Sequence, residues 1–221
     1  MVKFYIVEVD EVIDLKIYDQ LLLLISEDRC KKINGFKFDI DKKLSLYSEI
    51  LVRYLACHLF NIKNVCIKFK TNNYGKPYID SLPNFYFNIS HTRNAFVIGI
   101  SDNSIGVDIE KEKDFDIKIA KRFFTSNELN YILDFEESET NKYFYVIWTK
   151  KEAYIKYMGK GMSIPLKSFD VVSDDLSSKI YTFKVYDYIV SVCCDKCNDI
   201  EIREDMIVIS ESEFLEFALE I

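Results

Sequence analysis

The chain has 221 residues, a formal net charge of −7, 49% hydrophobic residues and only six Gly and three Pro. This composition predicts a packed core in one large or two small domains, and it is unlike that of a disordered chain. The net negative charge argues against general nucleic-acid binding. Residues 1–105 hold 14 Lys and Arg against 12 Asp and Glu, whereas residues 106–221 hold 15 against 24. The asymmetry suits an anionic ligand with a divalent metal, although a merely solvated acidic surface gives the same count.

The ends of the chain and its apolar runs give no sign of export or membrane insertion. The first residues reach an acid at Glu8 without a small-residue cleavage site, which is unlike a signal peptide. The longest aliphatic run, Leu21–Ile25, is far shorter than the roughly 20 apolar residues that span a bilayer. Six cysteines in such a chain indicate reduced thiols. We therefore expect a cytoplasmic protein with no membrane partner.

Hydrophobic periodicity predicts an alternation of strands and helices in the first half. The expected elements are a strand over 3–9, a short basic helix capped by Ser26, an amphipathic helix over 44–60, a strand over 65–70, a turn over 72–77 and strands over 85–90 and 95–101. The second half repeats the mixture. It predicts a strand over 105–110, helices over 117–124, 127–135 and 142–158, and strands over 169–172, 181–185, 189–194 and 206–210. The pattern indicates an α+β fold in which each half forms its own small lobe.

The strand over 105–110 carries two acids on one face. Its apolar residues alternate with Gly106, Asp108 and Glu110, so the two carboxylates point the same way. Two such carboxylates repel each other unless solvent or a cation separates them, and Mg²⁺ prefers oxygen ligands of this kind. Gly106 would leave room for a ligand to approach the backbone. A strand that ends in two solvated acids has the same spacing.

The helix over 142–158 carries charges next to its apolar stripe. Trp148, Glu152 and Lys156 form one row at i, i+4 and i+8, and Lys151 falls inside the stripe itself. Charges on a core-facing stripe are costly unless they are paired or bound to a ligand. The pattern therefore indicates either a functional site or an ordinary Glu152–Lys156 pair that supports the helix.

Three further segments have structural as well as functional readings. His91 follows an apolar strand, so it is expected in a turn where it could donate to a phosphate, while His58 is interpreted as structural. Thr125 and Glu128 fit a capping box. The run Cys194–Cys197 is a CxxC without a second pair or a suitably spaced His, which argues against zinc. The sequences typical of P-loop, Rossmann, zinc-protease and α/β-hydrolase sites are absent.

Taken together, the ordered motifs between about residues 25 and 170 resemble those of the Sfp-type 4′-phosphopantetheinyl transferases. The segments that carry the resemblance are Gly75-Lys76-Pro77, Phe87–His91, Gly106–Lys111, Ala120–Phe124 with Glu128, Trp148–Ala153, and Lys156 with Gly159–Gly161. Arg29 stands where the family often has lysine, and Ser45 where it often has threonine. Both keep a donor, so we expect altered ligand affinity at most.

The resemblance implies two similar α/β lobes, 1–104 and 105–221, related by a pseudo-twofold axis, with the C-terminal tail returning to the first lobe. It implies that coenzyme A and Mg²⁺, or Mn²⁺ in its place, lie between the lobes. The implied Mg²⁺ ligands are Asp108, Glu110 and Glu152. The implied coenzyme A contacts are Arg29, Lys32, Ser45, Lys76, Ser90, His91, Lys151 and Lys156, and Glu128 matches a further acid of the family pattern.

The implied reaction transfers the phosphopantetheine arm of coenzyme A to a serine of an acyl or peptidyl carrier protein. Either Glu152 or a metal-bound water would accept the serine proton, and Lys156 would stabilise the leaving group. The chain would act as a monomer, because two lobes already enclose one cleft. The rival interpretations are a catalytically silent homologue that binds a carrier or a nucleotide, and another Mg²⁺-dependent nucleotide enzyme. The motifs do not distinguish fatty-acid, polyketide and nonribosomal-peptide carriers, and they assign no role to Cys193, Cys194 or Cys197.

Overall fold

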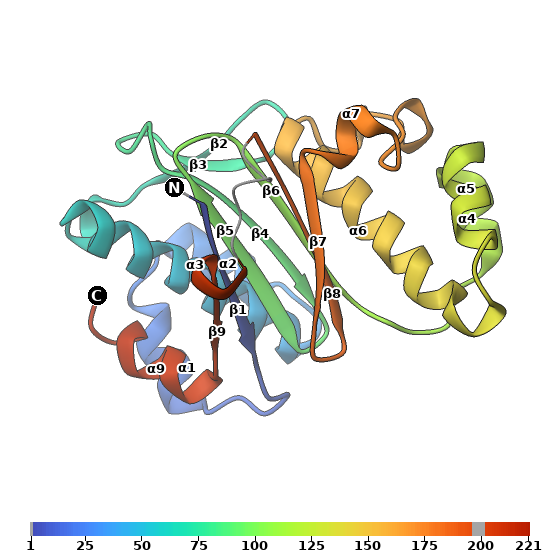
Figure 1. Ribbon diagram of the computed structural model, residues 1–221. Helices are drawn as coiled ribbons and strands as arrows, with labels where there is room; N and C mark the ends of the chain where they lie inside the picture. The colour runs from blue at the N-terminus through green and yellow to red at the C-terminus, as the bar shows by residue number, and fades with distance from the viewer. Residues whose placement is uncertain (1, 196–201) are drawn as a thin grey trace.

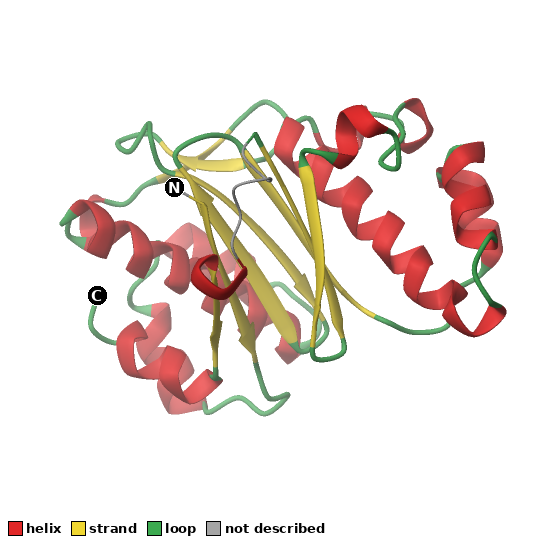
Figure 2. Ribbon diagram, in the orientation of Figure 1, coloured by secondary structure: helices red, strands yellow, loops and turns green. Residues whose placement is uncertain are grey.

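The computed structural model describes residues 2–195 and 202–221, and it arranges them as two α/β lobes whose sheets meet in the middle (Figure 1). Helices cover the outer face of each sheet (Figure 2). The fold is therefore α+β, as the periodicity predicts. Among the described residues, no helix combines the length and the apolar character that crossing a bilayer requires.

The first lobe is built on a four-stranded sheet with the order β4-β5-β1-β9. Its strands are β1 (Val2–Glu8), β4 (Tyr86–Thr92), β5 (Ala95–Ser101) and β9 (Met206–Ile209), with a small separate hairpin of β2 (Phe69–Thr71) and β3 (Pro77–Ile79). Its helices are α1 (Leu15–Leu22), α2 (Glu27–Asn34), α3 (Asp39–Phe60), α8 (Ile202–Asp205) and α9 (Glu211–Ala218), with a 3₁₀ turn over Asn64–Cys66. The long α3 buries its apolar face, including Leu44, Leu51 and Leu55, against the sheet.

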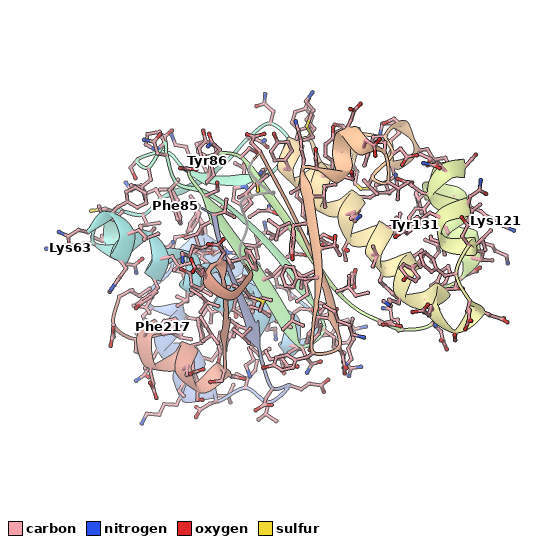
Figure 3. All side chains as sticks on the ribbon, in the orientation of Figure 1. Lys63, Phe85, Tyr86, Lys121, Tyr131 and Phe217 are labelled. Carbon is pink, nitrogen blue, oxygen red and sulfur yellow. The ribbon has the colours of Figure 1, made fainter. Side chains whose placement is uncertain are left out.

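The second lobe is built on a three-stranded sheet with the order β6-β8-β7. Its strands are β6 (Ile105–Lys111), β7 (Ile180–Val185) and β8 (Tyr188–Cys194). Its helices are α4 (Ile117–Phe123), α5 (Ser126–Leu133), α6 (Thr140–Met158) and α7 (Asp174–Ser177), with 3₁₀ turns over Glu137–Glu139, Gly161–Ser163 and Leu166–Ser168. Tyr131 of α5 lies between α5 and α6, where its ring centroid is 5.9 Å from that of Tyr143 (Figure 3). Lys121 of α4 lies at the outer edge of the lobe.

The two lobes repeat one arrangement. In each, a first strand (β1 or β6) is followed by a long helix (α3 or α6) and then by an antiparallel hairpin (β4–β5 or β7–β8). In each, the second strand of the hairpin pairs antiparallel with the first strand of the lobe, which gives the matching orders β4-β5-β1 and β7-β8-β6. The expectation of two similar lobes is confirmed, although no repeat is visible in the sequence itself.

The inner faces of the two sheets share one core. Phe4 and Val97 of the first sheet pack with Val107 and Val190 of the second. At the edge where the sheets adjoin, the Asn88 side chain of β4 accepts a hydrogen bond from the Val107 backbone N–H at 2.8 Å. The lobes are thus joined by a buried apolar layer and by a side-chain bridge between β4 and β6.

The C-terminal segment completes the first lobe. Strand β9 pairs parallel with β1, and α9 inserts Phe214 beside Tyr47 of α3 with ring centroids 4.7 Å apart. The fully buried Lys43 of α3 forms an ion pair with Glu211 at 2.6 Å, and Glu211 also accepts from the Asp10 backbone N–H. Residues 206–218 therefore lie with the lobe formed by the start of the chain.

One predicted strand is only partly right and another is wrong. Over 65–70 the strand starts at Phe69, in β2, after a 3₁₀ turn, because Val65 is largely exposed whereas Ile67 and Phe69 face the core. Over 169–172 the chain is irregular, because side chains rather than a neighbouring strand satisfy its backbone. Lys151 donates to the Phe169 carbonyl, and the Val171 N–H donates to a carboxylate of α5. Helices α1, α7, α8 and α9 and strand β3 were not predicted.

Candidate functional site

Strand β6 and helix α6 bring four predicted residues to one cavity. The cavity has a volume of about 410 Å³ and lies where β4, β6 and α6 meet. Its walls are Ile89, Ser90 and His91 from β4, Asp108 and Glu110 from β6, and Trp148, Glu152 and Lys156 from α6. The alternation of β6 and the i, i+4, i+8 row of α6 both predicted these faces correctly. We refer to this cavity as the carboxylate cavity.

The approach of α6 to β6 requires Gly106. A Cβ at this position would lie 2.0 Å from the Ala153 carbonyl oxygen and 2.3 Å from the Tyr157 nitrogen. The prediction that Gly106 makes room for a ligand is therefore wrong, since the backbone of α6 fills that space. The glycine instead sets the short distance between the strand that carries Asp108 and the helix that carries Lys156.

Lys156 is the cation of the carboxylate cavity. Its Nζ lies 2.6 Å from Asp108 Oδ1 and 2.7 Å from Ser90 Oγ, and the Ser90 hydroxyl in turn donates to the same Asp108 oxygen at 2.7 Å. The Lys156 side chain keeps a quarter of its surface exposed, while that of Asp108 keeps 6%. One ammonium thus draws together residues from β4, β6 and α6 and still faces the cavity.

The carboxylates of the cavity are crowded. Burial and the neighbouring Asp108 raise the pKa of Glu110 to about 7, and the same two causes raise the pKa of Glu152. Partial desolvation and the Lys156 ammonium lower the pKa of His91, although its ring is exposed at the surface. Such shifts are typical of sites that gather like charges for a ligand.

The donor set fits a divalent cation, although the side chains do not stand in a ready-made cage. Among the described residues, no three Asp, Glu, His or Cys side chains are close enough to hold a metal ion as they stand. Lys156 satisfies one oxygen of Asp108, but Asp108 Oδ2 is buried and has no hydrogen-bond partner. An orphaned buried carboxylate oxygen beside two carboxyls of raised pKa is the pattern that a hard cation would satisfy.

A second, basic cavity of about 680 Å³ lies on the first lobe and shares Ile89 with the carboxylate cavity. Its cationic lining comes from α2, α3 and the β2 segment: Arg29, Lys32, Arg53, Lys68 and Lys70. The predictions included Arg29 and Lys32 but missed Arg53 and the two lysines Lys68 and Lys70. Their signal was present, since both lysines alternate with the inward-facing Ile67 and Phe69.

Arg29 is held in place before any ligand arrives. Its Nε donates to Glu49 Oε2, and its guanidinium donates to Ser45 Oγ at 2.8 Å. Glu49 is buried and also pairs with Arg53 at 2.9 Å. Ser45 therefore lies beside the basic cavity as an orienting partner of Arg29.

Four predicted site residues line neither cavity: Ser45, described above, and Lys151, Glu128 and Lys76. Lys151 has no exposed surface, and its Nζ contacts Glu128 Oε1 at 2.7 Å and the Leu166 and Phe169 carbonyls. Glu128 forms the predicted capping box with Thr125. Lys76 directs its Nζ to backbone carbonyls at the junction of the lobes and does not line the basic cavity. Burial explains the positions of Lys151 and Glu128, because a fully hydrogen-bonded side chain without exposed surface cannot contact a ligand.

The remaining sequence features have plain structural roles or lie outside the description. His58 is exposed and stacks on Tyr54 with ring centroids 5.2 Å apart, as its structural interpretation requires. Cys193 and Cys194 are buried, and burial raises the pKa of the Cys193 thiol. The second cysteine of the CxxC run, Cys197, lies outside the described residues.

Comparison with known proteins gives one consistent result. Residues 104–196 match the model of the 4′-phosphopantetheinyl transferase superfamily, and residues 15–103 match that of the 4′-phosphopantetheinyl transferase N-terminal region. The chain belongs to the 4′-phosphopantetheinyl transferase superfamily. It is 39% identical over 169 residues to the 4′-phosphopantetheinyl transferase ffp of Bacillus subtilis. The aligned region covers 76% of this chain and 75% of the relative.

Two further relatives extend the likeness. The 4′-phosphopantetheinyl transferase Sfp of Bacillus subtilis strain 168 is 36% identical over 169 residues, again 76% of this chain and 75% of the relative. Another 4′-phosphopantetheinyl transferase of Bacillus subtilis is 34% identical over 217 residues, covering 91% of this chain and 97% of the relative. The resemblance read from the ordered motifs is confirmed, and it extends over both lobes.

Proposed function

We propose that this 4′-phosphopantetheinyl transferase moves the 4′-phosphopantetheine arm of coenzyme A onto a serine of an acyl or peptidyl carrier protein and releases adenosine 3′,5′-bisphosphate. The observation that carries the proposal is the cluster of Lys156, Ser90 and Asp108 at the junction of the lobes. It places a cation and a hydroxyl, both able to donate to phosphate oxygens, directly beside carboxylates.

The basic cavity is the place for the nucleotide end of coenzyme A. Arg29, Lys32, Lys68 and Lys70 supply positive charge for the 3′-phosphate, and the Phe69 ring lines the same space. Because Ile89 lines both cavities, a ligand that lies along β4 passes from the basic cavity to Ser90 and Lys156. That path suits a molecule whose phosphates continue from a nucleotide into a pyrophosphate.

Asp108, Glu110 and Glu152 would hold the divalent cation, Mg²⁺ or Mn²⁺ in its place. When bound, the cation neutralises charge on the pyrophosphate and on the three carboxyls. The buried, unpartnered Oδ2 of Asp108 and the raised pKa of Glu110 support this assignment. Lys156 then serves the phosphates, since its side chain keeps a quarter of its surface exposed toward the cavity.

The chemistry is a displacement at the β-phosphorus of coenzyme A. The serine oxygen forms a bond to that phosphorus, and the bond from phosphorus to the bridging oxygen breaks. Lys156 and Ser90 donate hydrogen bonds to the pyrophosphate as negative charge moves to the departing 3′,5′-bisphosphate. Glu152 lies in the same cavity and would accept the serine proton.

We further propose that the chain acts in the cytoplasm and as a monomer. Both cavities are formed by one copy of the chain, the basic one by the first lobe and the carboxylate one by β4 of the first lobe with β6 and α6 of the second. A second copy is therefore not needed to complete the site.

The deciding experiment combines the protein with coenzyme A, Mg²⁺ and several apo carrier proteins, and weighs each carrier by mass spectrometry. We expect one carrier or more to gain one phosphopantetheine group, with an equal amount of free 3′,5′-bisphosphate. Release of the bisphosphate without any carrier would indicate hydrolysis instead. Binding of the bisphosphate with no modified carrier would indicate a catalytically silent homologue.

A further inference from the structure

The turn between β2 and β3 is built as a rigid projection toward the second lobe. The Asn72 side-chain oxygen accepts from the backbone N–H groups of Tyr74 and Lys76 at 2.9 and 3.0 Å. Gly75 takes a φ of +89°, which a residue with a side chain adopts only under strain. The turn is thus fixed by its own hydrogen bonds. The Lys76 side chain and the amide nitrogen of Asn72 extend outward from it.

Both of those side chains cross to the second lobe. Lys76 Nζ donates to the Ile105 carbonyl at 2.8 Å and to the Lys156 carbonyl at 2.6 Å. The Asn72 amide donates to the Gly159 carbonyl at 2.8 Å. Ile105 begins β6 and Lys156 lies in the last turn of α6. One ammonium from the first lobe therefore binds the backbone of both elements that carry the carboxylate cavity.

The position of Lys76 is chemically suited to a helix end. The last carbonyls of a helix have no partner within the helix, and they attract cations. The close approach also depends on Gly159, where a Cβ would lie 3.2 Å from Lys76 Cδ and 3.4 Å from Asn72 Nδ2. Gly159 itself has a φ of +65° and ends the helix. The end of α6 is therefore shaped to receive the turn.

The contact does not act as an ordinary stabilising ion pair. No carboxylate among residues 2–195 and 202–221 pairs with Lys76, and burial lowers the pKa of its ammonium to about 8. Keeping this cation charged at the junction costs folding free energy. The neighbours of Lys76 in the chain, Gly75 and Pro77, line the basic cavity, so the turn touches the nucleotide space on one side and α6 on the other.

We propose that Lys76 is a positioning residue that, together with Asn72, clamps the nucleotide-binding turn to the end of α6 and so places the Lys156 side chain against Ser90 and Asp108. We call this set of contacts the inter-lobe clasp. It rests on the proposed function, because Lys156 acts on the pyrophosphate there. The two possible roles of Lys76 predict different effects. A residue that positions Lys156 affects kcat, whereas a residue that contacts the nucleotide affects the affinity for coenzyme A.

The test compares Lys76→Met with Lys43→Met. Lys43 is the control, because it too is a lysine that donates to two backbone carbonyls, those of Asp10 and Val12, but within the first lobe, where it also pairs with Glu211. We expect Lys76→Met to lower kcat roughly ten- to hundredfold, as small misplacements at reacting groups do, with an unchanged Kd for 3′,5′-bisphosphate by calorimetry. Folded Lys43→Met should keep the kcat of the original protein.

A milder variant keeps the test decisive if Lys76→Met does not fold. Asn72→Asp retains the side-chain oxygen that organises the turn, but it replaces the donor to the Gly159 carbonyl by a carboxylate oxygen that repels that carbonyl. We expect a severalfold fall in kcat with the same bisphosphate affinity. An unchanged kcat in the folded variants, or a loss of affinity that accounts for the whole loss of kcat/KM, would overturn the clasp.

A double-mutant cycle identifies the residue through which Lys76 acts. Lys156→Ala removes the side-chain ammonium but keeps the backbone carbonyl that Lys76 binds. If the clasp acts by placing that ammonium, Lys76→Met has little further effect in the Lys156→Ala background. Additive losses would contradict the proposal. Failure of the unmodified protein to transfer to any carrier would instead count against the proposed function.

Discussion

Helix α6 supplies the lysines of two lysine–carboxylate pairs, which differ in exposure and in how fully their polar atoms are hydrogen-bonded. The Lys151–Glu128 pair has no exposed surface, and both partners have further hydrogen bonds: the ammonium with two carbonyls, and the carboxylate with the Thr125 and Val171 N–H groups. The Lys156–Asp108 pair opens onto a cavity and leaves one Asp108 oxygen buried without a partner.

The difference separates structure from function on a single helix. A pair whose donors and acceptors are all satisfied has nothing left for a ligand, and it holds α5, α6 and the irregular segment after α6 together. A pair with a buried, unsatisfied oxygen retains capacity for a ligand and pays for it in stability. We therefore expect the Lys156–Asp108 pair, rather than the Lys151–Glu128 pair, to act on substrate.

The largest effect is expected when the Lys156–Asp108 pair, which opens onto the cavity, is removed. We expect Asp108→Asn and Lys156→Ala each to lower kcat/KM for transfer by about 10²–10³ or more, the range found when one group that stabilises developing charge is lost. Both proteins should remain folded by circular dichroism, because the pair borders a cavity rather than a packed core. The measurement is carrier modification followed by mass spectrometry under single-turnover conditions.

A surface pair of the second lobe provides the control. Lys184 lies 3.4 Å from Glu112 with half of its side chain exposed, so Lys184→Ala should change neither turnover nor stability appreciably. Near-normal turnover of folded Asp108→Asn would contradict the assignment of the carboxylate cavity.

The closed pair should show the opposite response. Lys151→Met leaves the Glu128 carboxylate buried without its counter-charge, which typically costs about 3–5 kcal/mol of folding free energy. Adding Glu128→Gln removes that charge but keeps an oxygen for only one of the Thr125 and Val171 N–H groups, so it should recover part of the loss in urea unfolding. The folded fraction of either protein should turn over normally. A folded Lys151→Met with a rate loss comparable to Lys156→Ala would erase the distinction between the pairs.

Local sequence patterns were enough for the elements that carry the site. The alternation over 105–110 placed Asp108 and Glu110 on one face of β6, and the helical row placed Glu152 and Lys156 on one face of α6. These predictions succeed because side-chain direction in a strand or helix follows from spacing alone. The same spacing placed Lys151 in the apolar stripe, where the structure buries it.

Contacts between distant segments could not be predicted in this way. Nothing near Lys151 in the chain identifies Glu128 as its partner, and nothing near Lys76 identifies the end of α6. The irregular course over 169–172 has the same cause, because side chains from α5 and α6 replace the expected neighbouring strand. The role of Gly106 was misread because the helix that fills its space lies about fifty residues further along.

Lys76 provides a third case beside the two lysine–carboxylate pairs, because its ammonium donates to the Ile105 and Lys156 carbonyls and pairs with no carboxylate among the described residues. Its pKa is about 8 in the folded protein and 10.5 ordinarily, so between these values the unfolded chain binds more protons. Stability from this group therefore rises with pH across that window and is constant below it. The melting temperature of the original protein, relative to Lys76→Met, should increase between pH 8 and 10. A difference that stays flat or falls would show that the ammonium is not confined at the lobe junction.

The smallest expected effect concerns Arg29, whose pairing lies between the two extremes. Its side chain keeps 27% of its surface exposed toward the basic cavity, yet Glu49 and Ser45 already fix two sides of its guanidinium. Arg29→Lys keeps the charge but replaces a planar fork by a single ammonium that cannot serve both partners. Losing one such hydrogen bond, about 0.5–1.5 kcal/mol, should raise KM for coenzyme A about two- to tenfold at unchanged kcat. A changed kcat with constant KM would mean that Arg29 acts on the reacting phosphates and not on the nucleotide end.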